Sequence, residues 1–224
     1  MNGIPHWYFH KLDNKYANYK IKCLDPNLLI DTILPPDNIV GSVVYPACEI
    51  VKPGTIKHIA GNRFSLGEPE GSESDRLKFI SDILKRAGFR APIQKNIRDE
   101  IWLKLLGNLS FNPISALTGA TLEQICNDQG TEEIVRAMMT EAKIIAEELG
   151  AKINMSIEKR IDGARKVGAH KTSMLQDIEA GKPIEIDSII IAVKELGELT
   201  CSPTPYIDTI LNLTLQKAKL IGCL

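Results

Sequence analysis

The stretch that decides the fold is Glu100-Ile-Trp-Leu-Lys104-Leu-Leu-Gly-Asn108-Leu-Ser-Phe-Asn112-Pro113. It belongs to a longer segment, residues 96–117, in which apolar residues recur at the spacing of an amphipathic helix. Lys104, Asn108 and Asn112 are four residues apart in it, so their side chains share one polar stripe. The stripe has an apolar background, because most residues around it are large and hydrophobic.

The polar stripe has two interpretations. In the first, the amides of Asn108 and Asn112 hold a carboxylate or hydroxyl while the Lys104 ammonium donates a proton to a carbonyl oxygen. Two asparagines are unfavourable in a helix, and Pro113 predicts a kink beside them. In the second, the stripe is a solvated helix face with an incidental kink. The residue pattern by itself leaves both open.

The part of the chain before this helix is typical of strands and turns. Residues 36–67 combine β-branched runs with a turn signal at Pro53-Gly54, which predicts a small meander of strands. A helix closed by Gly88 and a short last strand should follow. The expected strands are 39–45, 55–59, 63–66 and 91–94, and the expected helix is 75–87.

The part of the chain after residue 95 is helical throughout. After 96–117, further amphipathic helices are expected at 131–149, 156–167, 187–196 and 205–221. We therefore divide the chain into a mixed α/β piece, about 1–95, and an all-helical domain, about 96–224. The fold class expected is α+β.

A second group of polar residues lies in the helical part. Ser173 and Gln176 match a capping box, and Asp187 or Ser188 could cap the next helix. Glu185 stands between two isoleucines in an alternating segment. Such an acid is either an exposed side chain of an extended segment or a directed ligand, and the pattern leaves both open.

The composition excludes several classes of function. The formal net charge is -1 and no basic stripe is visible, so we expect no nucleic-acid partner. No apolar run approaches the roughly 20 residues that span a bilayer, so we expect no membrane insertion. The five cysteines form no Cys-x-x-Cys pair, which indicates reduced thiols in a cytoplasmic protein. His6 and His10 have a metal-compatible spacing without an evident third ligand, so we expect no metal site.

Several motifs in the same order resemble those of the ketopantoate reductases, the NADPH-dependent 2-dehydropantoate 2-reductases. They are Asn2-Gly3-Ile4-Pro5, the block from Asp99 through Asn112-Pro113 to Thr118, Ser173-Met-Leu-Gln-Asp177, and Glu185-Ile-Asp187. The turns Gly61-Asn-Arg63 and Gly67-Glu-Pro69 also agree with the family's pattern. The resemblance covers essentially the whole chain.

The resemblance implies a role for each motif residue that binds substrate. Lys104 would be the general acid that protonates the C2 oxygen of the keto acid. Asn108, Asn112 and Ser173 would hold the pantoate skeleton, and Asn2 would lie between substrate and cofactor. A later asparagine of the family pattern has no clear counterpart here.

The resemblance also implies NADPH as cofactor. Asn2, Ala47 and Glu185 would contact it, with Ala47 beside the nicotinamide and Glu185 at the cofactor end. In the family a glycine-rich turn that cradles the pyrophosphate precedes the segment matched by Asn2. The 224 residues contain no such turn, so we expect an N-terminally truncated member.

The resemblance finally implies an architecture and two competing functions. The architecture is a partial Rossmann-type sheet followed by a helical domain like that of 6-phosphogluconate dehydrogenase relatives. A sheet without its first strands has an exposed edge, so we expect a homo-oligomer. The first functional hypothesis is a reductase of a small keto acid. The alternative is a non-catalytic homologue that acts as a small-acid binding or assembly module.

Overall fold

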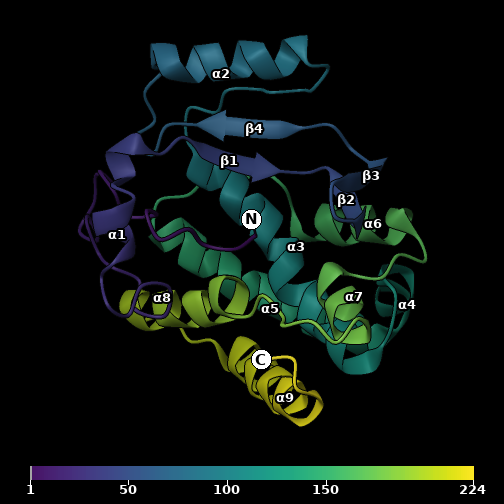
Figure 1. Cartoon of the computed structure of the whole chain (residues 1–224). Coiled ribbons are helices and arrows are strands. Elements are labelled where there is room, and N and C mark those ends of the chain that lie inside the picture. The colour runs from purple at the N-terminus through teal and green to yellow at the C-terminus, as the bar shows by residue number, and fades with distance from the viewer. Residues whose placement is uncertain (1) are drawn as a thin grey trace. The chain divides into compact units, whose positions relative to one another are not determined.

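The computed structural model describes residues 2–224, which form two compact units (Figure 1). The first unit comprises 7–19 and 28–101, and the second comprises 2–6, 20–27 and 102–224. The division falls inside one helix, after Ile101. The protein is a mixed α+β structure that is mostly helical, as the sequence predicts.

The strands of the first unit form two antiparallel pairs. β1 (Gly41–Val44) pairs with β4 (Phe64–Gly67), while β2 (Ala47–Lys52) pairs with β3 (Thr55–Ala60) as a hairpin. The predicted turn at Pro53-Gly54 closes this hairpin, with Gly54 at a φ of 75°. The predicted meander is wrong, because the hairpin closes on itself and β4 returns to β1.

One helix covers the β1–β4 pair. α2 (Asp75–Arg86) lies along β4 (Figure 1), begins at the cap Ser74 and is followed by Gly88 at a φ of 88°. Its inward face forms a small core with the strand and with the segment after the helix. The buried members of that core are Leu66, Leu77 and Ala91.

The last strand predicted for the first unit, 91–94, is wrong. The segment makes only isolated parallel bridges, Arg63 to Arg90 and Leu66 to Ile93. Pro92 has no N–H to continue the ladder, although its carbonyl accepts from the Leu66 N–H. Two short helices, α1 (Ile30–Ile33) and η1 (Pro36–Asn38), precede β1 and were not expected from the sequence.

The second unit is helical. Its elements are α3 (Ile97–Thr118, shared with the first unit), α4 (Leu122–Asn127), α5 (Gln129–Glu148), α6 (Ile157–Val167), α7 (Ser173–Glu179), η2 (Asp187–Ile191), α8 (Ala192–Thr200) and α9 (Pro205–Ile221). All of the expected helices are present, and α4 and α7 lie outside the expected ranges. The central α5 packs against α4, α6, α8 and α9. None of the helices in residues 2–224 is long and apolar enough to cross a membrane.

Two predicted caps are wrong by small shifts. The cap of α7 is Thr172, whose hydroxyl accepts from the Leu175 N–H, so the predicted Ser173 and Gln176 box is displaced by one residue. At the next helix neither Asp187 nor Ser188 is the cap. The helix begins with the π-helical turn η2, whose first residue is Asp187.

Candidate active site

The polar stripe lies on α3 as the sequence predicts. The helix runs through Pro113 to Thr118, and Trp102, Leu105 and Leu109 on its other faces are buried. This buried background fixes the orientation of the helix, so the side chains of the stripe emerge in a defined direction. Lys104 and Asn108 are half-buried, and Asn112 is buried.

Lys104 lies in an environment that lowers the pKa of its ammonium group. Burial lowers the pKa of its ammonium below the ordinary lysine value, and the negative charge of Glu185 partly offsets that lowering. A lysine with a lowered pKa is a better proton donor near neutral pH than an exposed lysine.

Asn112 is the most buried member of the stripe. It is only 5% exposed, and its Nδ2 makes no hydrogen bond with any residue in 2–224. A buried amide without a partner costs free energy, of the order of 1–3 kcal/mol, unless a ligand or water supplies an acceptor. Asn112 therefore carries a buried donor that is not satisfied within residues 2–224.

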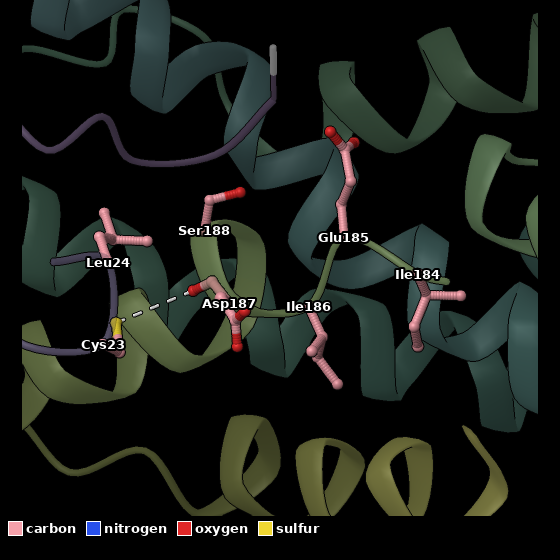
Figure 2. Close-up of a pocket in the computed structure, with 7 residues that line it drawn as sticks. All are labelled: Cys23, Leu24, Ile184, Glu185, Ile186, Asp187 and Ser188. Carbon is pink, nitrogen blue, oxygen red and sulfur yellow. Dashed lines mark hydrogen bonds between the residues drawn. The ribbon is translucent and has the colours of Figure 1, made fainter. Parts of the chain in front are cut away.

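Glu185 is presented by an alternating segment. Ile184 and Ile186 are 8% and 4% exposed, and Figure 2 shows both pointing to the side opposite Glu185. The two isoleucines anchor the segment in the core, so the carboxylate projects outward. Its Oε2 accepts a hydrogen bond of 2.9 Å from Nδ2 of Asn2. Glu185 thus interacts with both Asn2 and Lys104.

Backbone contacts hold Asn2 beside Glu185. The Ile4 N–H donates to the Ser188 carbonyl at 2.8 Å, and the Ser188 hydroxyl donates to the Asn2 carbonyl at 3.1 Å. Gly3 has a φ of 83°, and a Cβ built on it would lie 2.2 Å from the Ser188 oxygen. Only glycine fits this close approach. Sequence reasoning missed Gly3 and Ser188 as site residues, although the Asn-Gly pair was a signal of unusual backbone.

Comparison with known proteins identifies the family. The family model for the ketopantoate reductase PanE/ApbA C terminal matches residues 96–218. A 2-dehydropantoate 2-reductase from Mesorhizobium japonicum is 49% identical over 99% of this chain and 68% of its own length. The chain belongs to the ketopantoate reductase family. Its similarity to the family model and to this relative supports an oxidoreductase of the ketopantoate reductase type, as the motifs predict.

Solved structures of similar proteins support the same assignment. The crystal structure described as a ketopantoate reductase from Ralstonia solanacearum MolK2 has a TM-score of 0.95 and 39% identity. The alignment covers 100% of this chain and 68% of the Ralstonia chain. D-mandelate dehydrogenase, solved with NADH and anilino(oxo)acetate, has a TM-score of 0.78 at 21% identity, covering 87% of this chain and 64% of that chain. At that identity the likeness concerns the fold.

Two further predicted site residues are Ser173 and Ala47. Ser173 is exposed at the start of α7. Ala47 begins β2 in the first unit. The geometry of the second unit thus brings together Asn2, Lys104 and Glu185, and their roles stay predictions.

A cavity of about 260 Å³ lies beside the Glu185 segment (Figure 2). It is lined by Cys23, Leu24 and residues 184–188. The Cys23 thiol lies 4.0 Å from the Asp187 carbonyl, and burial together with Glu195 raises its pKa to about 12. The thiol therefore stays protonated and is no nucleophile. Residues 2–224 contain no group of three His, Cys, Asp or Glu side chains that could hold a metal.

Proposed function

We propose that this chain carries the substrate site of a reductase that converts 2-dehydropantoate to pantoate with NADPH. The observation that supports it best is the half-buried Lys104 with a lowered pKa, interacting with a Glu185 that Asn2 holds in place. A proton donor beside a hydrogen-bonded amide and carboxylate suits the reduction of a polar carbonyl compound.

The chemistry assigned to the chain is the proton transfer. NADPH, when bound, supplies the hydride that adds to C2 of the keto acid and leaves NADP⁺. Nζ of Lys104 gives its proton to the C2 oxygen, so that the carbonyl becomes a hydroxyl. Asn108 and Asn112, one and two turns further along α3, hold the oxygens of the substrate. The buried unsatisfied amide of Asn112 supports that role.

The residues that would hold the nicotinamide end of the cofactor are Asn2, Glu185 and, by family resemblance, Ala47. Glu185 is exposed, and its Oε2 accepts a hydrogen bond from Nδ2 of Asn2. An exposed carboxylate fits a ribose hydroxyl, which needs an acceptor. Asn2 and Glu185 thus fit the cofactor role assigned to them. The first unit would be part of a Rossmann-type sheet, with β1 and β4 among its strands. Ser173 would contribute to substrate binding from α7.

The test is reduction of 2-dehydropantoate by the full chain, followed by the loss of NADPH absorbance, together with NADPH binding by fluorescence. Lys104→Ala should lower kcat by about 10²- to 10⁴-fold, the contribution of general acid catalysis, while ligand binding is largely kept. An active Lys104→Ala variant with unchanged kcat would overturn the role of Lys104.

The same measurements test the alternative of a non-catalytic small-acid binding or assembly module. Binding of 2-dehydropantoate without measurable NADPH binding or turnover would favour this alternative.

We also propose that the protein is a cytoplasmic homo-oligomer. In the first unit, β2 and β3 are exposed on nearly every residue, and Ile50 and Ile56 form an exposed cross-strand pair. An isolated two-stranded hairpin with such a surface is marginally stable, so covering it would be favourable. Light scattering tests this, and a monodisperse monomer would contradict it.

A further inference from the structure

An apolar groove of about 440 Å³ lies between three helices of the second unit. Its walls come from the end of α3, the start of α5 and the outer face of α9. The aliphatic side chains of the lining include Ile114, Leu117, Ile134, Ile210, Leu213 and Leu220. Within residues 2–224, neither the polar stripe nor the Glu185 segment contributes to this lining, so the groove is separate from the candidate active site.

The groove leaves apolar surface in contact with water. Leu213 is 52% exposed and Leu220 is 76% exposed, although Ile114 in the α3 wall is buried. Small-molecule sites typically have volumes of about 300–1,000 Å³, mostly apolar walls and a small number of polar groups. The groove therefore has the size and the lining of a site for a ligand with an apolar body.

Lys217 provides the positive charge of this groove. It is half-buried on α9, and its Nζ donates to the carbonyls of Ala116 and Leu117 at 2.6 and 2.9 Å, in the last turn of α3. These two hydrogen bonds fix the ammonium at the α3 wall. An ammonium has three N–H donors, so a third remains for a ligand.

The charge of Lys217 is not balanced by the groove. The lining residues within 2–224 include no Asp or Glu, and both acceptors of the ammonium are neutral carbonyls. A half-buried charge is unfavourable unless an opposite charge accompanies it. Charge complementarity therefore favours a ligand that combines an apolar body with an anionic end.

We propose that the groove binds a free medium-chain fatty acid, with the alkyl chain along α9 and the carboxylate on Nζ of Lys217. A second copy of the chain fits less well. In a two-fold contact the same surface meets itself, so it would bring a second ammonium instead of a carboxylate. The proposal does not depend on the proposed function, because the two sites share no residue.

The experiment is calorimetry on the full chain with decanoate and with the neutral 1-decanol, both below micellar concentrations. Decanoate should bind one to one and more tightly than decanol. Lys217→Gln should weaken decanoate binding about 10- to 100-fold, the loss expected for a hydrogen bond to a charged group, and leave decanol binding unchanged. Lys219→Gln, at an exposed position outside the lining, is the matched control and should change neither.

A second variant tests the apolar wall without touching the contact between Lys217 and α3. Leu213→Glu is at an exposed position, so the chain should fold, and the new carboxylate should abolish decanoate binding. Ile144→Glu, equally 52% exposed but outside the lining, is its control and should bind decanoate normally.

Three results would overturn the proposal. The first is a wild-type chain that does not bind decanoate. The second is an equal effect of Lys217→Gln on decanoate and decanol. The third is self-association in light scattering that Leu213→Glu removes and decanoate leaves unchanged, since a second copy would then occupy the groove.

Discussion

The side chains of Asn2 and Glu185 are 183 positions apart in the sequence and share a hydrogen bond of 2.9 Å. The same carboxylate raises the pKa of Lys104 against the larger lowering caused by burial. Glu185 thus connects a segment from the start of the chain with the proposed proton donor of α3. The contact gives Glu185 an electrostatic role besides any contact with a cofactor.

This relationship predicts a pH effect of Glu185→Gln. The variant removes the negative charge and should lower the pKa of Lys104 further, so the ammonium is lost at a lower pH. Activity that needs the ammonium falls as pH rises through this pKa, and the falling limb of the kcat profile should therefore shift to lower pH. The control is Asn2→Ala, which keeps the Glu185 charge and should shift the falling limb of the kcat profile less. A limb that does not move would contradict the coupling.

Gly3 gives a prediction on stability. Gly3→Ala combines strain at a φ of 83° with a Cβ only 2.2 Å from the Ser188 oxygen, so it should detach the Asn2 segment. We expect a loss of about 1–3 kcal/mol in the free energy of unfolding, measured with urea. Gly119→Ala is the matched control, because Gly119 has a φ of 74° and nothing within 4 Å of its built Cβ. Equal losses in both variants would show that the close contact has no cost of its own.

Much of the arrangement of the candidate site was predictable because it depends on local periodicity. The i, i+4 spacing of Lys104, Asn108 and Asn112 is a property of one helix, and that helix forms as expected. The exposure of Glu185 between the buried Ile184 and Ile186 likewise follows from an alternating pattern. In these cases a single periodic element determines which side chains share a face.

The features that escaped prediction depend on pairings between distant segments. β1 and β4 are each plausible strands, but their sequences do not specify that β4 skips the β2–β3 hairpin to pair with β1. The approach of Arg160 to Gly107 joins two helices, and neither helix alone indicates it. The prediction of Ser173 as a cap was wrong for a different reason. Thr172 and Ser173 are adjacent and both carry a hydroxyl, and Thr172 is the residue that caps α7.

Arg98 gives a prediction within the first unit. It is 5% exposed, and its guanidinium donates to the carbonyls of Tyr8, Pro69 and His10. Arg98→Ala would leave these backbone acceptors without their donor, so we expect a loss of about 3 kcal/mol or more in unfolding free energy. Arg86→Ala, at an exposed position on α2, should change stability by less than about 0.5 kcal/mol. A small effect of Arg98→Ala would mean that water replaces the guanidinium.

Glu141 gives a prediction on the pH dependence of stability. Its carboxylate accepts from the Tyr206 and Ile207 N–H groups at 2.9 and 3.0 Å and so caps the start of α9. Burial raises the pKa of Glu141, and the two hydrogen bonds lower it by less. Because the pKa of the folded state is raised, the stability linked to this group is present at low pH and is lost as pH rises through that pKa.

The measurement is urea unfolding of the wild-type chain and Glu141→Gln across the acid range. Gln does not titrate, so the stability of the wild-type chain relative to the variant should decrease as pH rises. Glu141→Ala removes the acceptor and should cost about 1 kcal/mol or more at neutral pH, as the loss of a helix cap does. A relative stability of the wild-type chain that increases with pH would show that the backbone hydrogen bonds outweigh burial at this carboxylate.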